Sequence, residues 1–239
     1  VDKCCIPAGY KDERADRVGH RKVLSEALDE ICETDYPRTE TLDAVESKLF
    51  GIGSEAYVVG SHDFYLAYAM SRNKLLTMDA GHYHPTESIA EKITAILPFT
   101  GELMLHVSRP VRWDSDHVVI LDDPTKAILR EIKRADAFGK VYLAVDFFDG
   151  SINRIAAWVI GIRSTQKAAL LALLEPTEQL LRMEEAGDYT GRLALLEELR
   201  TMPFGAVWNK FCADNGVPIG PVWIDQVKQY EKKVLAERG

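Results

Sequence analysis

The sequence is poor in cysteine, lacks a long apolar run and has no block of basic residues, and each absence excludes a class of protein. The four cysteines, Cys4, Cys5, Cys32 and Cys212, show no C-x-x-C spacing and are too few for a disulfide framework, so we expect reduced thiols. No stretch approaches the roughly 20 apolar residues of a membrane helix, and no secretory leader opens the chain. We therefore expect a cytoplasmic protein that does not act at a membrane.

The charge balance argues against nucleic acid as a partner. Acidic residues outnumber basic residues by 37 to 29, which gives a net charge of -8. Because binding of nucleic acid or anionic lipid relies on clustered Lys and Arg, we expect a small neutral molecule or another protein instead. A length of 239 residues with 46% hydrophobic content suits one large globular unit.

Two kinds of apolar pattern alternate through the first 150 residues. Short runs typical of strands lie at 42–45, 75–78, 103–105 and 141–145. Helical patterns lie at 15–33, 62–72, 86–97 and 123–139. This alternation predicts an α/β fold with a parallel sheet. Beyond it only helical patterns remain, at 155–174, 178–185, 192–200, 207–213 and from 223 onward, so we divide the chain into an α/β domain, 1–150, and a helical extension, 151–239.

Capping residues predict where three of these helices begin. Ser61 is suited to cap the second helix, and Ser88 with Glu91 has the spacing of a capping box. Asp123 followed by Pro124 predicts a cap and a first-turn proline for the fourth helix. Two helices show apolar stripes that we expect to face the sheet, the first with Val23, Leu24, Ala27, Leu28, Ile31 and Cys32, and the second with Phe64, Leu66, Ala67 and Met70.

A polar side chain follows or ends each of the four predicted strands. Glu46, Asp79, His106 and Asp146 lie 33, 27 and 40 residues apart, close to the roughly 30 residues of one strand–helix–strand step. Because the carboxyl ends of parallel strands meet at one edge of the sheet, these four side chains are expected to converge. The alternative is that each is a solvated polar residue at a strand end.

These residues and their neighbours have the chemistry of a metal site. Three carboxylates and one imidazole form a hard to borderline donor set that suits Mn²⁺, Mg²⁺, Co²⁺ or Zn²⁺. Three further ligand-type residues follow the second and third strands, namely His82, Asp114 and Asp116. Asp79 is placed to bridge two ions, as carboxylates do in two-metal sites.

Other residues near the strand ends have two possible roles. Lys48 follows Glu46 by two positions, so on an extended chain both would point to the same side, and a lysine there could stabilise or protonate an oxygen that gains charge. The alternative is an ordinary surface lysine. Neither His84 nor His117 has clear ligand spacing, and both are expected to be supporting or loop residues. Aromatic residues that could wall a pocket, or simply fill the core, are Trp113, Phe147 and Phe148.

Five runs of sequence resemble the L-rhamnose isomerase family, from about Ile6 to the C-terminus. They are DAVESKLFGIG, MDAGHYHPTES, LMLHVSRPVRWDSDHVV, DFFDGSINRIAAWVIG and ALLEPTE. The pattern E-x-K, D-x-x-H, D-x-D and a final strand-end Asp is also similar to xylose isomerase-type barrels. The resemblance implies a (β/α)8 TIM barrel, of which this chain would hold about the fourth to eighth strands. It also implies a homotetramer, with the helical extension packing on the barrel and forming an oligomer interface.

The resemblance further implies an activity and residue roles. The activity is the interconversion of L-rhamnose and L-rhamnulose in rhamnose catabolism, with two divalent ions, preferably Mn²⁺. The first ion would be bound by Glu46, Asp79, His106 and Asp146, and the second by His82, Asp114 and Asp116. Lys48 matches the family's active-site lysine, so Lys48, Asp146 and Asp114 are the expected catalytic residues. The hydrogen would pass between C1 and C2 as a hydride, or as a proton through an enediol with Asp146 as base.

The sequence also departs from the family pattern. It begins near the end of the fourth barrel strand, and it reads Cys5-Ile6-Pro7-Ala8-Gly9 where the family has Trp-Ile-Pro-Asp-Gly. A barrel without its first three units would expose sheet edges and core, so we expect low stability and weak activity from such a piece alone. Two other functions therefore stay open: a catalytically incomplete fragment, and a metal-dependent phosphodiesterase-type TIM barrel.

Overall fold

The computed structural model describes residues 2–3, 15–47, 61–84, 86–111, 115–147 and 149–238. Five parallel strands form one sheet in the order β1-β2-β3-β4-β5. The strands are β1 (Asp2–Lys3), β2 (Ala44–Glu46), β3 (Leu75–Asp79), β4 (Leu103–Val107) and β5 (Val141–Val145). The strands expected near residues 45, 78, 105 and 145 are therefore confirmed, and so is the α/β class with a parallel sheet.

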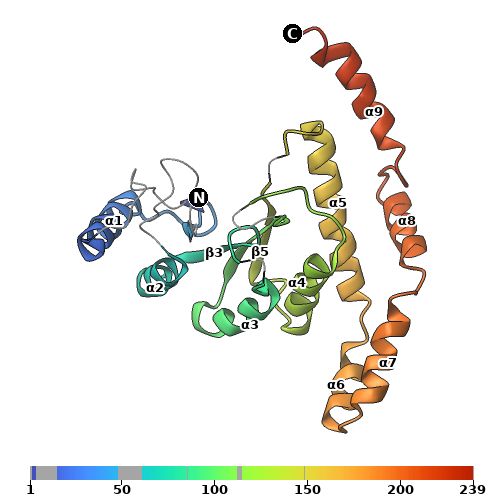
Figure 1. Ribbon diagram of the computed structural model, residues 1–239, viewed down its shortest axis with the longest axis horizontal. Coiled ribbons are helices and arrows are strands. Elements are labelled where there is room, and N and C mark those ends of the chain that lie inside the picture. Colours follow the sequence, from blue (N-terminus) through green and yellow to red (C-terminus); the bar gives the residue numbers. More distant parts are fainter. Residues whose placement is uncertain are drawn as a thin grey trace.

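The strand order places the helices on one face of the sheet. Each strand pairs with the next in the sequence, and crossovers between parallel strands are right-handed, so every connecting helix lies on the same side. Helices α2, α3, α4 and α5 pack side by side there (Figure 1). Their bounds are His62–Arg72, Ile89–Thr100, Asp123–Arg134 and Arg154–Leu173, and helix α1 (Arg17–Ile31) precedes β2. The opposite face of the sheet is left for polar side chains.

The predicted helix starts are correct to within a few residues. The Ser61 and Ser88 hydroxyls accept hydrogen bonds from the backbone N–H of Phe64 and Glu91. Helix α3 therefore begins after Ser88 and not at residue 86 as expected. The cap of α4 is Asp122, one residue earlier than predicted, because its carboxylate accepts from the N–H of Thr125. Helix α4 ends at Arg134, short of the predicted end near residue 139.

The buried faces of the first two helices differ from the predicted stripes. In α2 the buried residues are Tyr65, Tyr68 and Ala69, whereas Met70 is exposed. The apolar pattern missed this face because tyrosine is amphipathic: Tyr68 is buried while its hydroxyl donates to Asp29 of α1. In α1 the buried residues are Leu24 and Leu28, whereas Val23 and Ile31, also expected to be buried, are exposed.

A layer of apolar side chains joins the sheet to its helices. Leu76 and Met78 of β3 and Leu105 of β4 are fully buried in it. The strand register puts Asp79 and His106 side by side, and side chains alternate between the two faces of a strand. The residues on either side of Leu105 and Met78 therefore point away from the helices, toward the helix-free face.

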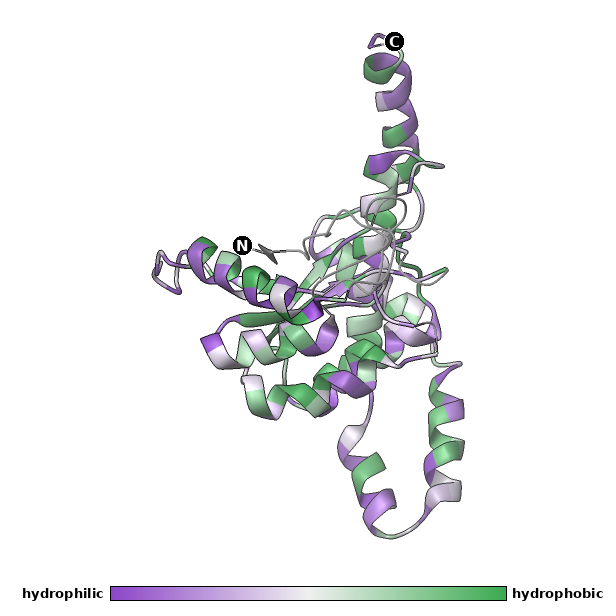
Figure 2. Cartoon of the chain, turned by 60° about the vertical axis from the view of Figure 1, so that its left-hand side comes forward, coloured by the Kyte–Doolittle hydropathy of each residue, from purple (hydrophilic) through white to green (hydrophobic). Residues whose placement is uncertain are grey.

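Beyond residue 150 the described chain contains helices joined by turns and no strand, as predicted. After α5 come α6 (Thr177–Glu185), α7 (Tyr189–Leu199), α8 (Phe204–Asp214), α9 (Trp223–Tyr230) and a π-helix (Glu231–Leu235). Helices α6 and α7 lie beyond the end of α5, α8 returns alongside α5, and α9 leads away from the sheet (Figure 1). Figure 2 shows hydrophobic as well as hydrophilic residues along these helices. Leu193, Phe211 and Val222 are among the exposed apolar residues. None of the helices within the described ranges is long and apolar enough to cross a membrane.

A buried carboxylate fixes the start of this helical segment to the sheet layer. Glu175, between α5 and α6, is 6% exposed and accepts two hydrogen bonds from Arg134 of α4, at 2.7 and 3.0 Å. Arg130 lies 3.5 Å from the same carboxylate. Paired Arg–carboxylate hydrogen bonds of this kind fix geometry as well as adding energy, so the α5–α6 junction is tied to α4.

Candidate metal centre

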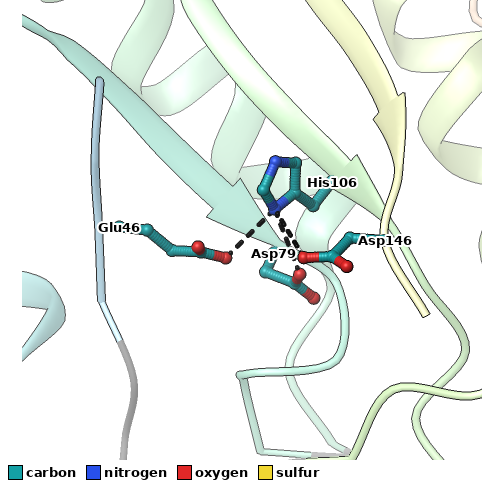
Figure 3. A group of neighbouring side chains, drawn as sticks. All are labelled: Glu46, Asp79, His106 and Asp146. Atoms are coloured by element: carbon teal, nitrogen blue, oxygen red, sulfur yellow. Dashed lines mark hydrogen bonds and ion pairs between the residues drawn. The ribbon is translucent and has the colours of Figure 1, made fainter. Parts of the chain in front are cut away.

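Four polar side chains meet at the carboxyl ends of neighbouring strands. Glu46 and Asp79 are the last residues of β2 and β3, His106 lies in β4, and Asp146 directly follows β5. Nδ1 of His106 lies 3.2 Å from Glu46 Oε1, 3.4 Å from Asp79 Oδ2 and 3.3 Å from Asp146 Oδ2 (Figure 3). The structure therefore brings together the four side chains whose spacing in the sequence predicted convergence.

The four residues differ in how much solvent reaches them. Glu46 and Asp79 are each 1% exposed, and His106 is 7% exposed. The Asp146 side chain is 57% exposed. Burial of several carboxylates in one place is unfavourable unless positive charge lies among them, so this arrangement requires positive charge from protonated imidazoles or from a bound cation.

A second group of ligand-type residues adjoins the first. It consists of Asp79, His82 and Asp116, so that Asp79 belongs to both groups. Nε2 of His82 lies 3.4 Å from Asp116 Oδ2. On the other side of the ring, Nδ1 is 3.0 Å from the carbonyl oxygen of Ser47. A proton on Nδ1 would be donated to that carbonyl, which leaves Nε2 as the atom able to bind an ion.

Atomic distances and unsatisfied oxygens fit a divalent cation. In each group, one ligand atom per residue can be chosen so that all lie within 4.8 Å of one another. Within the described part of the chain, Asp79 Oδ2 and Asp116 Oδ1 are buried and make no hydrogen bond. A buried carboxylate oxygen without a donor is costly, and a bound ion would supply the missing interaction. Oxygen and imidazole donors of this kind suit Mn²⁺, Mg²⁺, Co²⁺ and Zn²⁺.

Protonation of the two histidines reflects the same excess of negative charge. Burial alone would lower the pKa of His106, but the carboxylates of Asp146, Asp79 and Glu46 around its Nδ1 outweigh burial and raise that pKa to about 12. For His82, burial again lowers the pKa, while Asp116, Asp79 and Glu46 together raise it to about 9. The imidazoles are thus held as cations among the carboxylates, in the positions where a metal ion would supply positive charge instead.

The pKa values of the carboxylates shift in the directions that burial and the neighbouring charges require. Burial raises the pKa of Asp79 to about 6, because removal from water disfavours the ionised carboxylate. Burial also raises the pKa of Asp116, but the hydrogen bond and charge of His82 outweigh that effect and lower the pKa below its usual value. His106 lowers the pKa of the more exposed Asp146. At neutral pH Asp116 and Asp146 are therefore ionised, and so is most of Asp79, so all three carboxylates can bind a cation.

Comparison with known proteins identifies the family. A family model described as L-rhamnose isomerase (RhaA) matches residues 1–238. The chain belongs to the L-rhamnose isomerase family. Members of this family are isomerases, that is, intramolecular oxidoreductases, and the resemblance found in the sequence is confirmed.

Curated L-rhamnose isomerases match nearly the whole chain. The one from Rhodopirellula baltica is 59% identical over 238 residues, which are 100% of this chain and 56% of that protein. Those from Enterobacter sp. strain 638 and Escherichia coli strain SMS-3-5 are 57% and 56% identical over 234 residues. These matches cover 98% of this chain and 56% of each relative. The chain thus spans about half the length of the curated L-rhamnose isomerases it matches.

Some residues expected in the isomerase site lie outside the described residues. Lys48 and Asp114 are two of these, and so are the aromatic residues Trp113 and Phe148. Their expected roles stay predictions. Phe147 is described: its ring lies where a side chain on Gly161 of α5 would be, which makes it part of the packing under that helix.

The two remaining histidines of this region take no part in either group of ligands. His84 Nδ1 lies 2.7 Å from the Thr86 hydroxyl, within its own turn. His117 forms a backbone bridge with Arg109. Both are loop residues, as their lack of ligand spacing indicated.

Several residues that support the site were not found from the sequence. Ser108 donates to Asp79, the Ser47 carbonyl faces His82, and Gly81 packs against Asp116. One signal was available for Ser108, since it follows His106 by two positions and an extended chain directs both side chains to the same side. No signal was available for a backbone carbonyl such as that of Ser47.

Proposed function

We propose that the protein carrying this chain is a metal-dependent aldose–ketose isomerase that interconverts L-rhamnose and L-rhamnulose in rhamnose catabolism. Family membership supports the reaction class, and the names of the curated relatives support the sugar. The observation that carries the metal dependence is the pair of ligand groups that share Asp79. Because the chain spans 56% of its relatives, the activity is proposed for the protein in its full natural length.

We assign a ligand role to each residue of the two groups. Glu46, Asp79, His106 and Asp146 would hold one ion, and His82 and Asp116, with Asp79 between the groups, would hold a second. Asp114 joins the second group on the strength of the D-x-D motif. The mixed oxygen and nitrogen donors suit Mn²⁺, Zn²⁺, Co²⁺ and Mg²⁺, and we propose Mn²⁺ as the preferred ion because the resemblance to the family implies it.

The chemistry divides between the ions and the side chains. Two divalent cations when bound would polarise the sugar oxygens O1 and O2 and so favour transfer of a hydride between C1 and C2. Lys48 would donate a hydrogen bond to O1 as charge develops on it. Asp146, the most exposed of the four strand-end residues, is placed to meet the sugar or to hold a proton at the edge of the site.

The fold proposed for the whole protein is a (β/α)8 TIM barrel. Sequential strand order, with all connecting helices on one face, is the arrangement of a barrel wall rather than of a sheet covered on both faces. The described sheet would be an arc of about the fourth to eighth strands. Tyr142 and Leu143 of β5 are partly exposed at the edge of the arc, where a further strand would pair.

Residues 151–239 form the second proposed unit. Exposed apolar side chains on α7 and α8, such as Leu193 and Phe211, and Val222 just before α9 support a role in assembly as part of a homotetramer. The substrate partner would be the sugar, with no nucleic acid, as the net charge of -8 favours. A cytoplasmic location is part of the same proposal.

One assay tests the proposed function. The protein in its full natural length should form ketose from L-rhamnose in the presence of Mn²⁺. Incubation with EDTA should abolish this activity and added Mn²⁺ should restore it, because the ligand groups would lose and regain their ions. Turnover that persists after complete removal of divalent ions would overturn the metal dependence, and absence of ketose with ions bound would overturn the isomerase assignment.

A further inference from the structure

The two oxygens of the Asp79 carboxylate have different surroundings. Oδ1 accepts a hydrogen bond from the backbone N–H of Gly81 at 2.6 Å and another from the Ser108 hydroxyl at 2.8 Å. Oδ2 makes no hydrogen bond within the described residues and lies 3.4 Å from Nδ1 of His106. One oxygen is therefore held by two donors, while the other is directed to the group that contains Glu46, His106 and Asp146.

The two donors come from different parts of the chain. Gly81 lies in the turn after β3, whereas Ser108 directly follows β4 and is 4% exposed. The backbone between them is also joined, since the Ala80 N–H donates to the His106 carbonyl at 3.0 Å. The orientation of Asp79 is thus set by two neighbouring strands and not by its own strand alone.

The Ser108 hydroxyl has little free space around it. A Cβ atom on Gly81 would lie 2.7 Å from the Ser108 oxygen and 2.0 Å from Oδ1 of Asp116. The hydroxyl is therefore enclosed between the turn after β3 and the segment that carries Asp116. A rotation that turned the plane of the Asp79 carboxylate away from its two donors would leave the buried hydroxyl and amide without an acceptor, so the two donors select one orientation of the carboxylate.

We propose that Ser108 is a positioning residue that, together with the Gly81 amide, holds Oδ1 of Asp79 so that Oδ2 is the oxygen presented to a divalent cation at the Glu46, His106 and Asp146 group. This inference rests on the proposed metal function. It adds that the affinity of that group depends on a hydroxyl which touches neither ion nor sugar. Donors of this kind behind a ligand carboxylate typically change metal affinity by about 10- to 100-fold.

The test is Mn²⁺ binding by the protein in its full natural length, without sugar. Ser108→Ala removes the donor. In a titration that measures free Mn²⁺ by electron paramagnetic resonance, one class of site should bind Mn²⁺ about 10- to 100-fold more weakly than in the parent protein. Ser164→Ala is the matched control, because it removes another buried serine hydroxyl, which lies in α5 and lines a cavity with Trp208 that contains none of the proposed ligands. Its Mn²⁺ affinity should equal that of the parent protein.

A conservative variant separates positioning from packing. Ser108→Thr keeps the hydroxyl and should bind Mn²⁺ more tightly than the Ala variant, and the Co²⁺ absorption spectrum of the Ala variant should differ from that of the parent. Ser108→Cys, which keeps the volume but has a weak donor, replaces the Ala variant if that protein does not fold. If folded variants without the hydroxyl bind both ions with parental affinity, the proposed role of Ser108 is wrong, while the proposed metal function stands. A parent protein that binds no divalent ion would overturn the proposed metal function.

Discussion

Nδ1 of His106 lies 3.2 Å from Oε1 of Glu46, although 60 positions separate the two residues in the chain. Neither the helices nor the loops between them account for this contact. It follows from strand register, because β2, β3 and β4 are neighbours in the sheet and each carries its ligand-type residue at the same end. The contact therefore depends on strand length: a strand one residue longer would turn its terminal side chain to the opposite face.

Glu46→Gln should remove one of the two proposed ions. The amide cannot carry the negative charge that balances a divalent cation, so turnover of L-rhamnose should fall by more than about 100-fold. Metal analysis of the purified variant should find fewer bound ions than in the parent. Glu26→Gln, an exposed position on α1, is the control and should keep full activity and metal content. Equal metal content in the Glu46 variant would contradict the assignment.

Metal binding should weaken as pH falls. With pKa values of about 9 for His82 and about 12 for His106, both imidazoles carry a proton at neutral pH in the metal-free protein. A ligand imidazole must be neutral, so each ion displaces a proton, and lower pH favours the protonated competitor. Calorimetric titration with Mn²⁺ in buffers of different ionisation enthalpy should detect this release. A binding enthalpy that is independent of the buffer would rule it out.

Gly81→Ala should damage the second ligand group. The added methyl would lie 2.0 Å from Asp116 Oδ1 and 2.6 Å from the Ser115 carbonyl, so the segment that holds Asp116 must move. A displacement on this scale misplaces catalytic groups, and we expect a loss of activity of about 100-fold. Gly139→Ala is the matched control, since nothing lies within 4 Å of a methyl group there. The measurement is the activity of both variants, and equal activities would contradict the expected damage to the second ligand group.

Glu175→Gln should destabilise the protein without touching the site. Its carboxylate is 3% exposed, while the Arg134 side chain is 36% exposed, so solvent screens part of the pair. Loss of a fully buried pair costs about 3–5 kcal/mol, and we expect about 2–3 kcal/mol here. Urea unfolding provides the measurement. Glu178→Gln, at a side chain that is 94% exposed, should change the free energy of unfolding by less than about 0.5 kcal/mol.

The main features of the sheet and site could be predicted because each depends on local sequence. Apolar runs of strand length ending in polar residues fixed the positions of Asp79 and Asp146, and side-chain caps fixed the starts of α2 and α3. Parallel pairing then requires those polar ends to meet at one edge. Little tertiary information is needed for that step.

The parts that could not be predicted depend on contacts between distant segments. The buried face of α2 was placed about one position away from its true location, since burial of Tyr68 depends on packing in the core and on Asp29 of another helix, which accepts a hydrogen bond from its hydroxyl. Similarly, the hydrogen bond of Ser108 can be assigned only when the rotamer of Asp79 is known. Such choices are made by tertiary packing, which local propensity does not encode.

The unidirectional order of the strands has a consequence for biosynthesis. During translation the ribosome releases Glu46 first, then Asp79 and His106, and Asp146 last, so the ligands emerge in the order in which their strands stand in the sheet. The first group of ligands is complete only when β5 has joined. Capture of the proposed cation at that group would therefore follow the addition of β5 to the sheet, and it would stabilise that strand.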